Sequence, residues 1–262
     1  MQIKVYETKD ELAQAAAAQA AALLDEAITQ RGAATFVAAT GNSQLAFLDE
    51  LLRNPAVDWS RTTMFHLDEY LGLPATHPAS FRLYLTRHLI ERVHPGRTYL
   101  IEGDAPDVEA ERRRLNQLLR NREVDVLFAG IGENGHLAFN DPPADFEVDD
   151  PYIVVDLDTA CRQQQVGEGW FASIEDVPRQ AISMSIKQIM RARAIVAVVP
   201  ERRKAQAVVD CFTGEVSPLH PASILRRHDR AYVFLDKESA ALLPAQAQSK
   251  EFVRFDPPNR VH

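Results

Sequence analysis

The hydrophobic pattern of the chain alternates between short apolar runs and longer stretches with helical spacing. The short runs predict strands at residues 3–7, 35–40, 62–70, 97–103, 124–132, 152–156, 181–185, 194–200 and 230–236. Helical spacing predicts helices over about 9–30, 43–53, 77–93 and 107–121. Because such alternation is typical of βαβ units, it predicts an α/β fold with a mostly parallel, doubly wound sheet and helices on both faces.

Polar or glycine-bearing segments follow three of the predicted strands, at residues 40–43, at Asp68 and at residues 134–141. Open α/β sheets bind ligands at the carboxyl ends of their strands, so these segments are expected to meet at one crevice. The polar stretches 141–151 and 161–176 break the alternation and are predicted to be loops over this crevice. Together they belong to a lid region at about residues 141–180.

The bulk composition is that of an ordinary globular protein, with 262 residues, 46% hydrophobic and 25% charged. We interpret the chain, residues 1–262, as a single α/β domain with a loose tail at about 250–262. The formal net charge of −8 gives no overall electrostatic footprint for nucleic acid or an anionic membrane. An anionic ligand would therefore need a local positive pocket.

The cysteines and the start of the chain indicate in which cellular compartment the protein is expected. Cys161 and Cys211 are far apart and lack the spacing of a disulfide framework or a zinc site, so no metal is expected. The first residues lack the basic and apolar regions of a signal peptide, and no apolar run approaches the roughly 18 residues of a membrane span. These features predict a cytoplasmic protein.

The segment ATGNSQ places Thr40, Gly41, Asn42 and Ser43 between a strand and a helix. Backbone N–H groups at such a helix start, with two hydroxyls, suit a phosphate. A plain helix cap at Asn42 or Ser43 explains the motif equally well. The segment is neither GxGxxG nor a P-loop, so it gives nucleotide binding little support.

The segment FHLDEYLGLP brings Asp68 and Glu69 to the end of an apolar strand. Neighbouring side chains on an extended segment point in opposite directions, so only one of the two is expected to face a ligand. The other would take a structural hydrogen bond. On this motif alone, a purely structural role is favoured.

The segment GIGENGHLAFNDPP is the most informative, because it places His136 five residues before Asp141 with Asn134 and Asn140 beside them. A nearby carboxylate can fix the imidazole tautomer and raise its proton affinity, which suits proton transfer near neutral pH. An incidental surface histidine is the alternative. The surroundings of His136 favour a functional one.

A third cluster, in VVPERRKAQ, places Arg202, Arg203 and Lys204 in the first turn of a predicted helix. The helix dipole disfavours cations there, so the cluster indicates an anionic partner, with solvated helix charges as the alternative. Arg162, in the predicted lid, is a weaker candidate for the same task.

Taken in order, ATGNSQ, FHLDEYLGLP, GIGENGHLAFNDP and PERRKA resemble the motifs of the glucosamine-6-phosphate deaminase/isomerase family, over most of the chain. The resemblance implies a Rossmann-like sheet and conversion of glucosamine 6-phosphate into fructose 6-phosphate and ammonia. It implies a hydrolase or isomerase of amino sugar and carbohydrate metabolism that needs no cofactor, since the substrate amine and fixed hydrogen bonds carry the developing charge.

The resemblance also assigns roles to single residues. Asp68 matches the base that moves a proton between C2 and C1 of the sugar, and His136 matches the histidine that opens the ring. Residues 40–43 match the phosphate loop, although Asn42 replaces its second glycine. Lys204 matches the phosphate-binding lysine.

Two candidate catalytic residues depart from the family pattern. Asn134 stands where many members have Asp, so it can orient a partner but cannot act as an anion. Asp141 stands where the family usually has Glu, which shortens the acid by one methylene and could move its oxygens by more than ~1 Å. Either the backbone compensates, or this member handles a different sugar phosphate.

Three alternatives stay open from the sequence: a deaminase of another hexosamine phosphate, a 6-phosphogluconolactonase, and a sensor that binds a sugar phosphate without turnover. The segment GHLAFNDP favours the deaminase branch, because lactonases typically have the sequence GHTASLFP at the comparable position. A sensor would be expected to carry a DNA-binding segment, which we do not find. The C4 epimer of the substrate is undecided, and a homo-oligomer is an open prediction.

Overall fold

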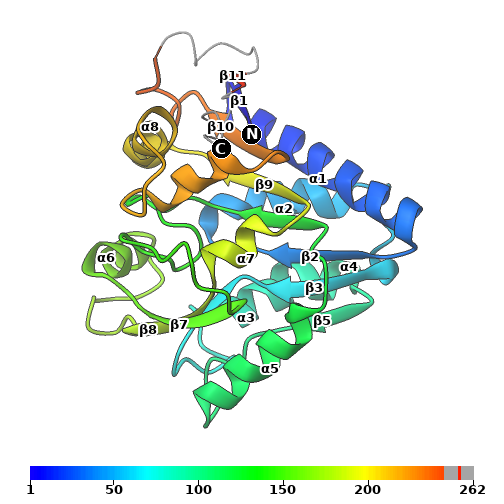
Figure 1. Ribbon diagram of the computed structural model, residues 1–262, viewed down its shortest axis with the longest axis vertical. Helices are drawn as coiled ribbons and strands as arrows, with labels where there is room; N and C mark the ends of the chain where they lie inside the picture. Colours follow the sequence, from blue (N-terminus) through cyan, green and yellow to red (C-terminus); the bar gives the residue numbers. More distant parts are fainter. Residues whose placement is uncertain (245–252, 255–262) are drawn as a thin grey trace, which may run out of the picture.

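The computed structural model describes residues 1–244 and 253–254 (Figure 1). The strands are β1 (Gln2–Tyr6), β2 (Ala34–Ala38), β3 (Thr62–His66), β4 (Asp68–Tyr70), β5 (Arg97–Tyr99), β6 (Val126–Ala129), β7 (Tyr152–Asp156), β8 (Gln180–Met184), β9 (Ala194–Val199), β10 (Ala231–Asp236) and β11 (Val253–Arg254). The helices are α1 (Lys9–Arg31), α2 (Leu45–Arg53), α3 (Phe81–Leu85), α4 (Glu91–Val93), α5 (Val108–Arg120), α6 (Thr159–Gly167), α7 (Ile186–Met190) and α8 (Ala205–Thr213). The predicted tail at about 250–262 lies outside the described residues except for β11.

Seven parallel strands form the main sheet in the order β1-β10-β9-β6-β2-β3-β5, and β11 pairs antiparallel with β1 at one edge. The predicted mostly parallel, doubly wound sheet is confirmed. The chain runs from β2 toward β5 and then from β6 toward β10, so the order reverses between β2 and β6. Such a switch point opens a crevice at the carboxyl ends of the two strands.

Helices cover both faces of this sheet, with α1 and α2 packed together on one face and α5, α7 and α8 toward the other (Figure 1). This division follows from right-handed crossovers whose direction changes at the switch point. The alanine-rich α1 is capped by Thr8, whose side chain accepts from the Glu11 N–H, and ends at Gly32 with φ 83°. Its small buried side chains allow a close approach to the sheet. Within the described residues, no helix is both long and apolar enough to cross a membrane.

The predicted strand at 62–70 was wrong as a single element, because it divides at Leu67 into β3 and β4. β4 leaves the main sheet and forms a separate antiparallel sheet with β8 and β7. The predicted runs 152–156 and 181–185 therefore do not extend the parallel sheet. Apolar residues mark a strand but do not set its partner, and the partly exposed pattern of β7 differs from that of the fully buried β6.

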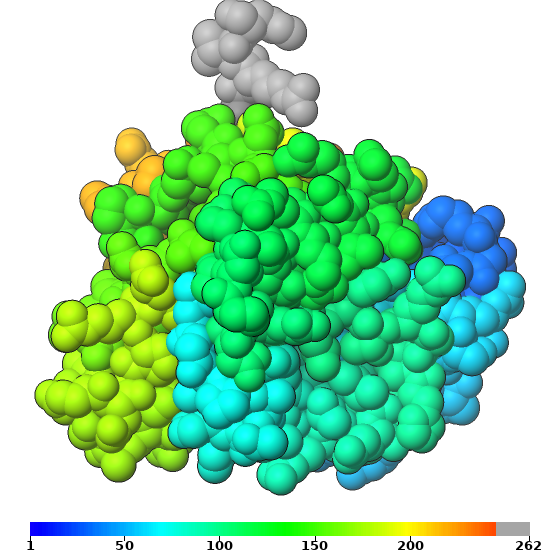
Figure 2. Space-filling view, turned by 90° about the horizontal axis from the view of Figure 1, so that it is seen from below, coloured from blue at the N-terminus to red at the C-terminus, as the bar shows by residue number. Residues whose placement is uncertain are grey.

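The small sheet positions the lid against the main sheet. In Figure 2 the cyan chain near residues 70–80 lies beside the yellow-green chain near 165–180, in agreement with the pairing of β4 and β8. The side chains between them form a second apolar core that includes Tyr70, Phe81, Phe139 and Phe171. The predicted loop 161–176 was wrong in its first part, because residues up to Gly167 continue helix α6, which Asp158 caps through the Cys161 N–H.

Candidate active site

A cavity lies at the switch point, at the carboxyl ends of the central strands. It is lined by the segments that follow β2, β3, β6 and β9, by the first residue of α3, and by residues of α6 and its C-terminal cap: Ala39, Thr40, Gly41, Ser43, Leu67, Asp68, Phe81, Gly130, Ile131, Gly132, His136, Ala138, Phe139, Gln164, Gln165, Glu168 and Lys204. The sequence-predicted convergence of three motifs on one crevice is therefore what the structure shows.

Asp68 faces this cavity, and only 6% of its surface is exposed. Among the described residues, no hydrogen bond to its carboxylate is found. Burial raises the pKa of Asp68 to about 8, with the charge of Glu69 as the second cause. A carboxyl group with such a high proton affinity can take a proton from carbon near neutral pH and return it.

Glu69 points the other way and serves the fold. Its two oxygens accept the backbone N–H groups of Tyr70, Phe81 and Arg82 at 2.9, 3.2 and 2.7 Å and the Ser80 hydroxyl at 2.9 Å. These bonds fix the start of α3 relative to β4. The expectation that one carboxylate of the pair faces the ligand and the other is structural agrees with this geometry.

His136 and Asp141 form a hydrogen-bonded pair, with 3.0 Å between imidazole Nδ1 and carboxylate Oδ1. Since Asp141 occupies Nδ1, the other ring nitrogen is left for the cavity. Burial alone would raise the pKa of Asp141, but its hydrogen bonds with His136, Asn134 and the Asp158 N–H outweigh burial and lower it. Despite its shorter side chain, Asp141 therefore reaches the imidazole as an anion.

Asn134 holds this pair in place. Its amide nitrogen donates to Asp141 at 3.0 Å and more weakly to Asp158 at 3.4 Å, while its oxygen accepts the His136 N–H at 3.1 Å. A carboxylate at this position would repel both acids, which explains an amide here. Gly132 is equally required, because a Cβ on it would lie 2.4 Å from the His136 ring.

Other residues that line the cavity suit an anion. Gly41, at φ 107°, allows the backbone to turn from β2 into a short 3₁₀ turn that leads into α2. Thr40, Gly41 and Ser43 line the cavity there. Lys204 is only 3% exposed, and within the described part of the chain its ammonium group forms no hydrogen bond or ion pair. Burial lowers the pKa of Lys204 to about 8.

Two predicted phosphate ligands lie outside this cavity. Asn42 lines a neighbouring pocket, where its side chain donates to the Glu168 carbonyl at 3.3 Å. Arg162 donates to the carbonyl oxygens of Ile174 and Val177 and so ties α6 to the loop after it. The structure brings neither side chain together with Lys204.

Several lining residues were missed by the sequence analysis. Gln164, Gln165 and Glu168 reach the cavity from α6 and its C-terminal cap. The segment QQQVGE was visible as polar, but helical spacing within it would have been needed to show which of its side chains point inward. Gln165 accepts the Tyr70 hydroxyl at 2.7 Å, which fixes α6 on the second core.

The residues that could hold a metal ion here are His136, Asp141 and Cys161, each with one ligand atom, all within 4.8 Å of one another. The Cys161 thiol is fully buried, and burial, followed by the charge of Asp141, raises its pKa. A metal would have to displace that proton and the bond between His136 and Asp141. This donor set favours a hydrogen-bonded cluster.

A protein-family model, described as glucosamine-6-phosphate isomerases/6-phosphogluconolactonase, matches residues 7–234. A glucosamine-6-phosphate deaminase of Streptococcus pyogenes serotype M1 is 38% identical over 213 residues, which cover 81% of this chain and 89% of the relative. That of Lactobacillus delbrueckii subsp. bulgaricus is 35% identical over 243 residues, 93% of this chain and 100% of the relative.

Solved structures of deaminases and lactonases are also similar to this chain. A monomeric glucosamine-6-phosphate deaminase superposes with a TM-score of 0.85 at 31% identity, over 92% of this chain and 100% of that chain. The 6-phosphogluconolactonase of Trypanosoma brucei gives 0.77 at 16% identity, over 92% and 98% of the two chains. The second likeness shows a shared fold alone.

Proposed function

For a chain that belongs to the glucosamine-6-phosphate isomerase/6-phosphogluconolactonase family, we propose deamination of glucosamine 6-phosphate to fructose 6-phosphate and ammonia. The relatives at 35–38% identity are glucosamine-6-phosphate deaminases. The observation that carries the proposal is one cavity lined by Asp68, Lys204 and His136, with Asp141 hydrogen-bonded to the His136 ring. Neither the segment that carries Asp68 nor the segment that carries His136 would specify this reaction alone.

The phosphate binds beside Lys204. The ammonium of Lys204, the Ser43 hydroxyl and the backbone N–H groups of residues 41–43 supply donors to its oxygens. This anchor fixes the sugar so that its C1 and C2 atoms lie between Asp68 and His136, and such positioning is itself worth a large part of the rate.

Ring opening is the task of His136. Its free nitrogen takes the proton of the anomeric hydroxyl and gives it to the ring oxygen as the bond between C1 and that oxygen breaks. Asp141 holds the ring orientation and stabilises the imidazolium that forms in between, while Asn134 keeps Asp141 in place. Shortening the acid from Glu to Asp preserves this task, because the 3.0 Å contact is made.

Isomerisation is the task of Asp68. The carboxylate removes the proton from C2 while the C1 carbonyl oxygen takes a proton from water, which gives an enolamine. The carboxyl group then returns its proton to C1, which gives the protonated imine of the ketose. Water adds at C2 and ammonia leaves, so one water is consumed for each ammonia. A pKa of about 8 keeps the carboxyl group able both to accept and to release this proton.

A product assay tests the proposal. The protein is incubated with glucosamine 6-phosphate, and ammonia and fructose 6-phosphate are measured together; the proposal expects equal amounts. Galactosamine and mannosamine 6-phosphates, run in parallel, test the substrate epimer, and 6-phosphogluconolactone tests the lactonase alternative. Lactone hydrolysis without ammonia release from any of the amino sugars would reject the assignment.

The cellular setting and assembly remain predictions. We propose a cytoplasmic location, supported by two free, buried cysteines and by a sugar phosphate as substrate. The homo-oligomer stays a prediction from the sequence, and a similar solved deaminase is monomeric. Light scattering on the purified protein at micromolar concentration would decide the assembly.

A further inference from the structure

The cavity that holds Asp68 and Lys204 is too small for a sugar phosphate. Its volume is about 70 Å³, whereas sites for small-molecule ligands usually measure roughly 300–1,000 Å³. A neighbouring outer pocket of about 750 Å³ is lined by Asn42, Glu133, Asn134, Ala160, Gln163, Gln164, Gly167, Glu168, Glu201 and Arg203. Among the described residues, Gln164 and Glu168 alone line both spaces, so they lie in the wall between them.

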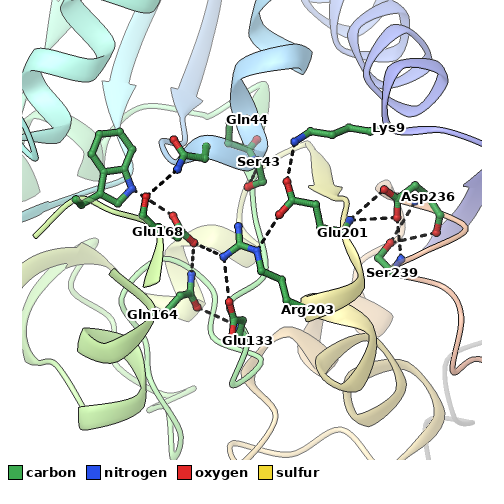
Figure 3. Close-up of polar contacts among 12 residues, drawn as sticks. Lys9, Ser43, Gln44, Glu133, Gln164, Glu168, Glu201, Arg203, Asp236 and Ser239 are labelled. Atoms are coloured by element: carbon green, nitrogen blue, oxygen red, sulfur yellow. Dashed lines mark hydrogen bonds and ion pairs between the residues drawn. The ribbon is translucent and has the colours of Figure 1, made fainter. Parts of the chain in front are cut away.

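Glu168 is the charged part of this wall. Its carboxylate accepts from Arg203 at 2.7 Å, from Gln164 at 2.8 Å and from the Trp170 indole at 3.2 Å (Figure 3). Only 9% of the side chain is exposed. Burial alone would raise the pKa of Glu168, but the bonds and charges of Arg203 and the charge of Lys204 outweigh it, so the group is an anion at neutral pH.

Arg203 forms ion pairs with several carboxylates, and a bound phosphate would compete with them for its guanidinium group. Besides Glu168 it binds Glu133 at 3.0 Å and Glu201 at 2.8 Å, and Lys9 holds Glu201 from the other side at 2.7 Å (Figure 3). The backbone of Glu201 has φ 83°, a conformation that non-glycine residues rarely adopt. The short 3₁₀ turn that follows Glu201 carries Arg203, which lines the outer pocket, and Lys204, which lines the inner cavity.

The charges around the wall create a conflict for substrate binding. In the described part of the chain Lys204 forms no ion pair, so the inner cavity holds a cation that could bind a phosphate, yet the nearby carboxylate of Glu168 would repel a phosphate dianion. A sugar without a phosphate has no negative charge that could replace the carboxylate of Glu168 next to Arg203 and Lys204. A phosphate brings two negative charges and can replace the one that Glu168 withdraws.

We propose that Glu168 is an anion-exchange gate that selects the phosphorylated substrate, and this rests on the proposed function of the same cavity. In the ligand-free protein the carboxylate of Glu168 occupies Arg203 in place of a phosphate, close enough to Lys204 for their charges to interact but without an ion pair to it in the described residues. The phosphate displaces it, α6 moves with Glu168, and the inner and outer spaces join into one site. Arg203 then turns from Glu168 to the phosphate.

Calorimetric titration with inorganic phosphate tests the gate without requiring turnover. Glu168→Gln keeps the shape and the bond to Gln164 but removes the charge, so phosphate should bind about tenfold more tightly. Arg203→Gln should weaken phosphate binding about tenfold. Glu133→Gln is the matched control, because Glu133 shares Arg203 but lies outside the inner cavity; a change below about twofold is expected.

The signs of these changes separate the gate from a structural latch. If Glu168 and Arg203 only hold the lid together, both substitutions alter phosphate affinity in the same direction, and that result overturns the proposal. An unchanged affinity in Glu168→Gln overturns it as well. Thermal melting of each variant shows whether it is folded. Loss of the proposed activity with opposite signs still present would reject the function and keep the gate.

Discussion

Replacing Asp68 with Asn should make the protein more stable and catalytically inactive. Asp68 is buried, and no group in the described residues donates a hydrogen bond to it, so its charge is costly in the folded state. Asn has nearly the same shape and no charge. The substitution therefore removes that cost together with the proposed base.

The size and sign of the stability change follow from the pKa. The folded-state pKa of Asp68 is about 8 against an ordinary 3.8. The folded protein therefore binds this proton more tightly, and the wild type loses stability relative to Asp68→Asn as pH rises from about 4 to 8. At about 1.36 kcal/mol per pKa unit, even half of that shift is worth about 3 kcal/mol. Above pH 8 the difference should be constant.

Urea unfolding of both proteins at pH 5 and pH 8.5 measures this difference, and ammonia release measures the activity. We expect a gain of about 2–3 kcal/mol at pH 8.5, a much smaller one at pH 5, and at least about 10³-fold lower kcat. Glu69→Gln is the matched control; it breaks bonds at the start of α3 and should destabilise the protein by about 1–3 kcal/mol. Equal stability of Asp68→Asn and wild type at pH 8.5 would refute the reasoning.

Three further outcomes are expected. His136→Gln should use the cyclic substrate slowly but show a milder defect with an open-chain analogue; steady-state rates with both compounds check this, and equal losses would reject the ring-opening role. Gly132→Ala should lower kcat/KM by about 10²-fold, because the new methyl displaces the His136 ring; unchanged kinetics would contradict that. The pH profile of kcat/KM should be a narrow bell near pH 8, because Asp68 must lose its proton as pH rises through about 8 while Lys204 must keep its own below about 8; a profile flat from pH 6 to 10 would contradict it.

The parallel sheet could be predicted because its strands are continuously apolar and alternate with helices. The second sheet could not, because β4 follows β3 after a single residue and nothing in FHLDEYLG marks the change of sheet. The pairing of Asp68–Tyr70 with Ala181–Ser183 depends on contacts between residues more than a hundred positions apart. Residue patterns are local and do not encode such partners.

The site likewise contains residues that the sequence could predict and residues that it could not. Residues 40–43, Asp68 and His136 each follow an apolar strand, so the rule for strand ends was enough to predict that they meet at one crevice; Lys204 was predicted from its place at a helix start and from the family resemblance. Glu168 escaped notice because its place depends on how α6 docks, through Gln165 on Tyr70 and Arg162 on the loop carbonyls. Arg162 was predicted as an anion ligand on charge alone, and a guanidinium group can equally well bind carbonyl oxygens.

Transfer of the C2 hydrogen tests the central claim, that Asp68 in this cavity carries a proton between two carbons of the sugar. Glucosamine 6-phosphate deuterated at C2 is converted in ordinary water, and the fructose 6-phosphate formed is examined by NMR. The account predicts that part of the deuterium appears at C1, since a buried carboxyl group returns what it removed, and that Asp68→Asn forms no such product. Complete loss of deuterium to water by the wild type, or its appearance at C1 with Asp68→Asn, would contradict the account.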